Sequence, residues 1–138
     1  MNLRTVFEQN EMMRMADKIT VLVVEDEPIT RMDVVEQLEE GGFRVFEASN
    51  ADKAIKILEE NPAISVLFTD VDMPGSMDGL KLAAAVRDRW PPIKIVVASG
   101  LRKINMDALP DNSRFFSKPY NVNEIAATMR HMVQRPLG

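Results

Sequence analysis

Five short apolar segments, separated by stretches with helical periodicity, limit most strongly what this chain can fold into. They are centred on residues 19–25, 43–49, 64–70, 93–99 and 113–118. Continuous runs such as "ITVLVVE" are rich in β-branched residues and are typical of strands buried on both faces. One crossover helix fits between successive strands, which favours parallel neighbours and right-handed connections. We therefore predict an α/β fold: an open, doubly wound sheet of five parallel strands with helices on both faces.

The segments between the strands carry recognisable helix starts and stops. Pro28 stands where a helix start tolerates the missing N–H, and Gly41-Gly42 is expected to end that helix. Asp78 is predicted to cap the helix that follows the third strand, because its side chain can accept a hydrogen bond from an unpaired N–H. A short helix is expected at about 102–109. A last helix is expected to open at Lys118-Pro119.

The length and composition exclude several classes of function. With 138 residues the chain fits one domain, which we predict at 19–138, after an extension at 1–18 that is flexible or helical. A net charge of −4 indicates neither a nucleic-acid surface nor a membrane-binding patch. The lack of cysteine and the single histidine exclude thiol catalysis, a multi-histidine zinc site and most catalytic triads. No apolar run approaches the roughly 20 residues of a membrane span, so a cytoplasmic location is expected.

Polar side chains follow four of the five predicted strands. Glu25 and Asp26 follow the first, Asp70 ends the third, Ser99 ends the fourth and Lys118 ends the fifth. In an open parallel sheet, ligands bind at the carboxyl ends of the strands, so these groups should meet at one edge. Crowded carboxylates repel one another unless a cation lies between them, and oxygen ligands of this kind suit Mg²⁺ or Mn²⁺. Any one acidic residue alone is better explained as a solvated turn residue; their convergence favours a site.

This ordered set of segments resembles the receiver domain of bacterial two-component response regulators. It consists of "VVEDE", "LFTDVDMPGSMDG", "VVASG" and "FSKPY", and the resemblance covers about residues 19–135. The resemblance implies a flavodoxin-like sheet with strand order 2-1-3-4-5. It also implies a phosphorelay signalling protein that is no enzyme beyond accepting a phosphoryl group and slowly losing it again.

The partners that the resemblance implies are proteins. The phosphoryl donor would be a phosphohistidine on a sensor histidine kinase or a histidine phosphotransfer protein. Since little chain follows the last helix, a stand-alone receiver is expected, with output through an unidentified protein. The surface that changes would combine the helix at 102–109, the strand at 113–118 and the last helix. A monomer, or a weak dimer through that surface, is expected.

The resemblance also assigns roles at the strand ends. Asp70 matches the phosphoacceptor. Glu25 and Asp26 match the acidic pair that binds Mg²⁺ together with Asp70 and the backbone carbonyl of Asp72. Lys118 matches the lysine that contacts a phosphoryl oxygen. The metal would neutralise charge on the group being transferred.

Two further positions match the family's switch. Ser99 matches the hydroxyl that moves to hydrogen-bond the phosphoryl group. Phe115 occupies the place of the switch aromatic, three residues before Lys118, although a plain core role has equal weight. Asp72 and Leu101 lie where side chains are expected to modulate dephosphorylation.

Two alternatives share parts of this pattern. A haloacid-dehalogenase-like phosphatase also uses a strand-end aspartate and a second one two residues later, here Asp70 and Asp72, but that motif normally follows the first strand. A flavodoxin-like FMN binder would need a phosphate loop rich in Ser, Thr and Gly after the first strand, where this chain has acidic residues. The loop around Gly75-Ser76 also departs from the receiver pattern, because it is one residue longer than the commonest form.

Overall fold

Five parallel strands form a single sheet in the computed structural model, which describes residues 18–73, 75, 77–100, 109–110 and 112–133. The strand order is β2-β1-β3-β4-β5, and every neighbouring pair is parallel. The strands are β1 (Thr20–Val24), β2 (Arg44–Ala48), β3 (Val66–Asp70), β4 (Lys94–Ser99) and β5 (Arg114–Ser117). The predicted fold class and strand order are confirmed.

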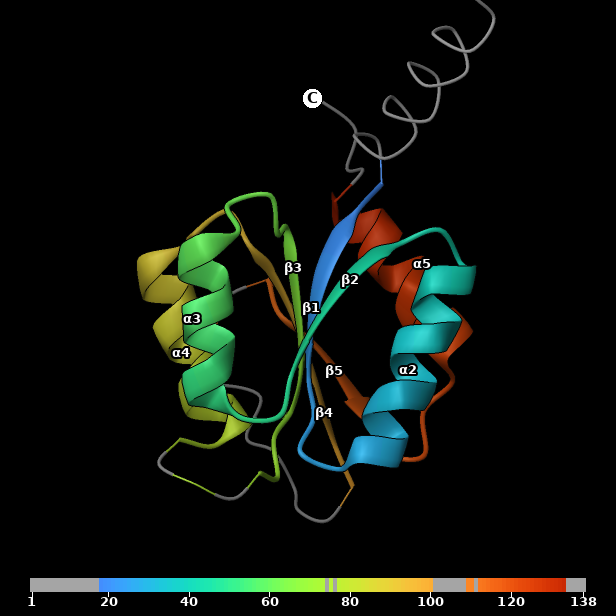
Figure 1. The fold of residues 1–138 in the computed structure, drawn as a ribbon, viewed down its shortest axis with the longest axis horizontal. Helices are drawn as coiled ribbons and strands as arrows, with labels where there is room; N and C mark the ends of the chain where they lie inside the picture. The colour runs from blue at the N-terminus through green and yellow to red at the C-terminus, as the bar shows by residue number, and fades with distance from the viewer. Residues whose placement is uncertain (1–17, 74, 76, 101–108, 111, 134–138) are drawn as a thin grey trace, which may run out of the picture.

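Helices cover both faces of this sheet (Figure 1). They are α2 (Pro28–Glu40), α3 (Ala51–Glu60), α4 (Gly79–Arg89) and α5 (Val122–Val133). In Figure 1, α3 and α4 lie on one side of the sheet and α2 and α5 on the other. Each side has its own apolar core, because alternate residues of the central strands point to opposite faces. Val21 and Val23 pack under α2 and α5, whereas Leu22 and Val24 pack under α3 and α4.

Two predicted segments fall outside the described residues. They are the short helix expected at about 102–109, of which residues 102–108 are not described, and the extension at 1–18, of which only residue 18 is described. None of the helices in the described part of the chain is both long and apolar enough to cross a membrane.

Side-chain caps fix where the helices begin. The Asp78 side chain accepts from the backbone N–H of Lys81 at 2.9 Å, as predicted, and so starts α4. Asn50 caps α3 in the same way, accepting from the N–H of Lys53 at 2.8 Å. Each cap satisfies one of the N–H groups that a helix start leaves unpaired.

Replacing the cap of α3 should lower stability without changing the fold. We expect Asn50→Ala to reduce the free energy of unfolding by about 1 kcal/mol, because an N–H at the helix start loses its partner. Urea denaturation measures this change. Asn50→Asp keeps an acceptor oxygen and should lose little; an equal loss in both variants would contradict the capping role.

The strand register brings the polar strand ends together. Asp70, the last residue of β3, is paired with Ala98 of β4, so Ser99 lies one residue beyond it. On the other side, the N–H of Glu25 continues the β1–β2 ladder by donating to the carbonyl of Ala48 at 3.1 Å. The carboxyl ends of the strands therefore lie along one edge, the lower edge in Figure 1.

Candidate functional site

Three carboxylates meet at the ends of β1 and β3. Glu25, Asp26 and Asp70 each offer an oxygen atom, and these atoms lie within 4.8 Å of one another. Glu25 and Asp70 are buried, at 5% and 6% exposure, while Asp26 is partly exposed. A set of oxygen donors at this separation suits a hard divalent cation such as Mg²⁺ or Mn²⁺.

Lys118 provides the cation that faces this cluster from the end of β5. Its Nζ lies 3.1 Å from Oδ2 of Asp70 and 3.8 Å from Oε1 of Glu25. Its backbone N–H donates to the carbonyl of Ser99 at 3.0 Å, which ties the β5 end to the β4 end. The Lys118-Pro119 peptide bond is cis, a point that the sequence alone left open. Lys118 therefore contacts the carboxylate expected to carry the phosphoryl group.

Burial changes the titration of Glu25. Loss of solvent, with smaller contributions from the neighbouring Asp26 and Asp70, raises the pKa of this carboxyl from 4.5 to about 7. A hydrogen bond from the N–H of Glu27, at 3.1 Å, and the charge of Lys118 oppose this increase in pKa. The ionised form of Glu25 is therefore costly until a cation is bound beside it.

The raised pKa makes the stability of the metal-free protein depend on pH. Between pH 4.5 and about 7, folded Glu25 keeps a proton that the unfolded chain has released, so stability falls as pH rises. We expect Glu25 to account for a loss of about 1–2 kcal/mol in unfolding free energy across that range, after allowing for solvent screening. Urea denaturation at several pH values measures it.

Two comparisons check the origin of this pH dependence. Glu25→Gln keeps an acceptor for the Glu27 N–H and should remove this part of the pH dependence. Mg²⁺ should stabilise the wild type more at alkaline than at acidic pH, because only the ionised carboxylate is a good ligand. An unchanged pH dependence in Glu25→Gln would contradict the assignment.

Asp72 lies between the phosphoacceptor candidate and the switch candidate. Its N–H donates to Oδ1 of Asp70 at 3.3 Å, and its Oδ2 accepts from the Ser99 hydroxyl at 2.8 Å. Ser99 is 2% exposed.

The lengthened part of the loop is described at Gly75 only, because Ser76 lies outside the described residues. Gly75 has a φ of 113°, a backbone conformation that favours glycine.

The two aromatic residues of β5 lie on opposite faces of the sheet. Phe115 is partly buried against the core under α3 and α4, and Phe116 against the core under α2 and α5. The predicted switch position thus contacts a core, which is compatible with either of its two predicted roles. Leu101, predicted as a modulator, lies outside the described residues.

Tyr120 and Arg31 support the site, although the sequence did not single them out. The Tyr120 ring packs edge-on against Phe68 at 5.6 Å, and burial, with the nearby Glu25 and Asp70 charges, raises its pKa to about 12. Arg31 donates to the Glu25 carbonyl at 2.8 Å. The sequence contained a signal for Tyr120, because this residue belongs to the "FSKPY" segment. It contained none for Arg31, because the contact of Arg31 with the Glu25 carbonyl depends on how α2 packs.

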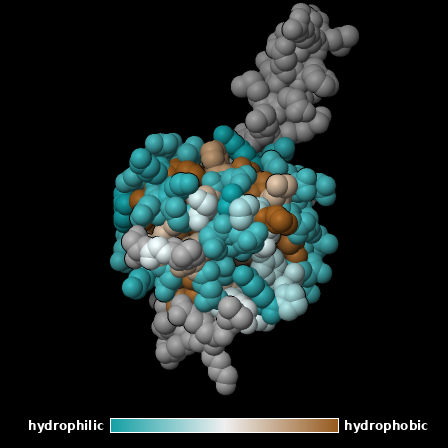
Figure 2. All heavy atoms as spheres, turned by 60° about the horizontal axis from the view of Figure 1, so that its bottom comes forward, coloured by the Kyte–Doolittle hydropathy of each residue, from teal (hydrophilic) through white to brown (hydrophobic). Residues whose placement is uncertain are grey.

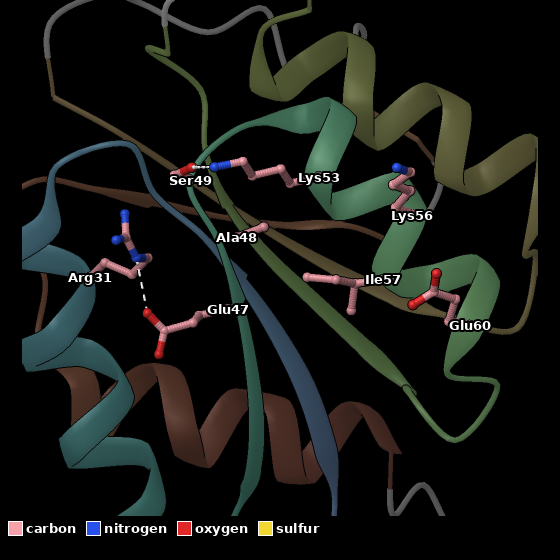
Figure 3. A pocket seen from close by; sticks show the side chains of 8 residues that line it. All are labelled: Arg31, Glu47, Ala48, Ser49, Lys53, Lys56, Ile57 and Glu60. Atoms are coloured by element: carbon pink, nitrogen blue, oxygen red, sulfur yellow. Dashed lines mark hydrogen bonds and ion pairs between the residues drawn. The ribbon is translucent and has the colours of Figure 1, made fainter.

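Arg31 also borders a separate hollow at the end of β2. Figure 3 shows it reaching from α2 to Glu47 of β2, with a distance of 3.0 Å between Nε and Oε1. Lys53 and Lys56 of α3 line the other side. This ion pair connects α2 to the edge strand β2, close to the loop that carries Glu25.

The face on which the strands end is mostly hydrophilic. Figure 2 turns the lower edge of Figure 1 toward the viewer and shows polar residues there, with hydrophobic residues in small separate patches.

The fold and the strand-end carboxylates define a doubly wound α/β protein with an acidic site at the carboxyl ends of its strands. The family model for the response regulator receiver domain matches residues 21–130. This chain belongs to the response regulator receiver domain family. It is thus a receiver domain of the kind found in two-component signalling, as the sequence resemblance predicted, and the phosphatase alternative based on Asp70 and Asp72 is not supported.

Individual relatives agree with the family match. The chain is 35% identical over 123 residues to the sensor kinase CckA of Brucella abortus (strain 2308), covering 84% of this chain but 13% of that kinase. The receiver protein of Sinorhizobium medicae WSM419 superposes with a TM-score of 0.79 at 26% identity, covering 86% of this chain and 97% of the other. The receiver domain of the hybrid histidine kinase CckA gives a TM-score of 0.71 at 29% identity, covering 83% and 99%.

Proposed function

We propose that Asp70 accepts a phosphoryl group, assisted by Lys118 and by a divalent cation held by Glu25, Asp26, Asp70 and the backbone carbonyl of Asp72. The observation that carries this proposal is the position of the buried Asp70 carboxylate. It lies within 4.8 Å of both other acidic groups and 3.1 Å from the Lys118 ammonium. No other cluster of three potential metal-ligating side chains occurs among the described residues.

The proposed transfer step forms one bond and breaks one. An Asp70 carboxylate oxygen forms a bond to phosphorus as the bond between phosphorus and the donor's histidine nitrogen breaks. Lys118 donates a hydrogen bond to a phosphoryl oxygen, where charge is concentrated. Mg²⁺ or Mn²⁺, when bound, would stabilise the remaining negative charge. The reaction is one acceptance per chain followed by slow hydrolysis, so we propose a signalling component rather than an enzyme with turnover.

The signal would leave the site through Ser99 and Phe115. Ser99 is at the end of β4, next to Asp70, and its hydroxyl can turn toward a phosphoryl oxygen. Phe115 lies in the adjacent strand β5, paired with Val97. Rotation of the aromatic ring into space left by Ser99 would change the surface around β5 and α5, which we propose as the output surface and as the place of any weak dimer.

The partners follow from the family and from the surface beside the site. We propose a histidine kinase or phosphotransfer protein as donor; the similarity to the CckA kinase receiver supports a phosphorelay. On α2, close to the acidic loop, Ile29 and Met32 are 76% and 60% exposed, and they suit an apolar contact with the donor. We propose that the receiver unit spans 19–138 and acts in the cytoplasm.

Incubation with a small phosphodonor and Mg²⁺ tests the assignment of Asp70. We expect intact mass spectrometry to show one added phosphoryl group on the wild type, and none on Asp70→Asn or after chelation of the metal. Asp88→Asn, at an exposed position near the end of α4 that is far from the acceptor, is the matched control and should be modified like the wild type. Equal modification of Asp70→Asn would overturn the proposal.

A further inference from the structure

The Ser99 hydroxyl is already engaged by a charged group in this structure. Its Oγ donates to Oδ2 of Asp72 at 2.8 Å, and Ser99 is 2% exposed. A hydroxyl has one proton to donate, and a hydrogen bond to a carboxylate is among the stronger ones. The proton with which Ser99 would contact a phosphoryl group is therefore committed to Asp72.

The surrounding backbone is held in place, so the side chain of Ser99 is the part that can move. The Ser99 carbonyl accepts from the N–H of Lys118 at 3.0 Å, and the N–H of Val71 donates to the Ala98 carbonyl at 2.9 Å. The N–H of Asp72 is directed to Asp70, at 3.3 Å from Oδ1. Asp72 thus touches the acceptor with its backbone and Ser99 with its side chain.

We propose that Asp72 is a positioning residue that holds the Ser99 hydroxyl away from the phosphoryl site. This proposal rests on the proposed function, which makes Asp70 the acceptor and Ser99 the switch. A phosphoryl group on Asp70 brings acceptor oxygens that compete with Asp72 for the same proton. Ser99 then exchanges one charged acceptor for another, so the new hydrogen bond is largely offset by the lost one. Asp72 therefore weakens the coupling between phosphorylation and the switch.

A simpler effect of Asp72 must be separated from this one. Its negative charge also repels an anionic group bound at Asp70, whether or not Ser99 is present. A double-mutant cycle separates the two, because repulsion persists when Ser99 is replaced by alanine, whereas competition for its proton does not.

The experiment measures the affinity of the full chain for beryllium trifluoride with saturating Mg²⁺, a non-covalent mimic of a phosphoryl group on a carboxylate. The four proteins are the wild type, Asp72→Ala, Ser99→Ala and the double variant. In the protein that keeps Ser99, we expect Asp72→Ala to raise the affinity for the mimic about 10-fold. In the Ser99→Ala background, the same substitution should raise the affinity by a factor that is smaller by roughly 3-fold or more. Asp72→Asn keeps a neutral acceptor for Ser99. Its affinity gains with and without Ser99 should therefore differ by a smaller ratio than those of Asp72→Ala.

The outcomes distinguish this proposal from the proposed function. Equal gains in both backgrounds overturn the role of Asp72 toward Ser99 but leave Asp70 as acceptor, since the mimic still binds. Failure of the wild type to bind the mimic overturns both. Thermal unfolding checks that each variant is folded; if Asp72→Ala is not, Asp72→Asn in both backgrounds supplies the same cycle with a smaller expected ratio.

Discussion

Lys118→Met should slow phosphoryl acceptance by about 100-fold or more while leaving the fold intact. Among the residues that the structure describes, Lys118 has the only positively charged side chain within 4 Å of the Asp70 carboxylate, with Nζ 3.1 Å from Oδ2. Removing one such donor from a transfer site typically lowers the rate by about 100-fold or more. Its side chain is 33% exposed, so methionine can occupy the position without loss of packing. The rate of mass gain with a small phosphodonor and Mg²⁺ measures the effect.

Metal affinity separates a role in transfer from a general loss of the site. The Lys118 ammonium competes with a divalent cation for the same carboxylates, so its removal should not weaken Mg²⁺ binding. Lys56→Met, on the exposed side of α3, is the matched control and should match the wild type in both measurements. A Lys118→Met protein that accepts phosphoryl groups at the wild-type rate would contradict the assignment.

Gly79→Ala should be among the most destabilising single substitutions in the chain. A Cβ at Gly79 would overlap the backbone carbonyl oxygen of Asp70 and lie 2.7 Å from the Cα of Val71. These atoms belong to the backbone and cannot rotate away, so β3 and α4 must separate. We expect a loss of about 3 kcal/mol or more in the free energy of unfolding, at the upper end for overpacking. Because the strain falls on Asp70, phosphoryl acceptance should also drop.

A second glycine provides the matched control. At Gly41 the atom nearest to an added Cβ would be Nη2 of Arg130 at 3.2 Å, the end of a side chain that donates to the Gly41 carbonyl at 2.6 Å. Because a side chain can shift where backbone cannot, Gly41→Ala should cost much less than Gly79→Ala in the same urea denaturation experiment. Similar losses in the two variants would show that the close approach of α4 to β3 is not the cause.

The sequence was sufficient for the architecture because the three central strands, β1, β3 and β4, are buried on both faces. Runs such as Val66–Asp70 leave no polar face and so differ clearly from the helices around them. The rule that ligands bind at strand ends then placed Glu25, Asp70 and Lys118 together, and the structure brings both carboxylates within 4 Å of the lysine Nζ. Asp78 was recognised as a cap from its position just before an apolar helical stripe.

Contacts that depend on side-chain direction could not be predicted in this way. Glu25 and Asp26 are adjacent in one loop, and periodicity does not indicate which of them is buried. The hydrogen bond between Asp72 and Ser99 joins residues from two strand ends, so its existence depends on loop geometry. The need for glycine at position 79 arises from the approach of α4 to β3, which no local pattern encodes.

Chemical trapping of the phosphorylated residue tests the central claim most directly. Borohydride reduces an aspartyl phosphate to homoserine, which peptide sequencing by mass spectrometry can locate in the chain. After treatment with a phosphodonor and Mg²⁺, we predict homoserine at position 70 and at no other aspartate. Homoserine at Asp26 or Asp72 in place of Asp70, or none in a protein that has gained a phosphoryl group, would contradict the account.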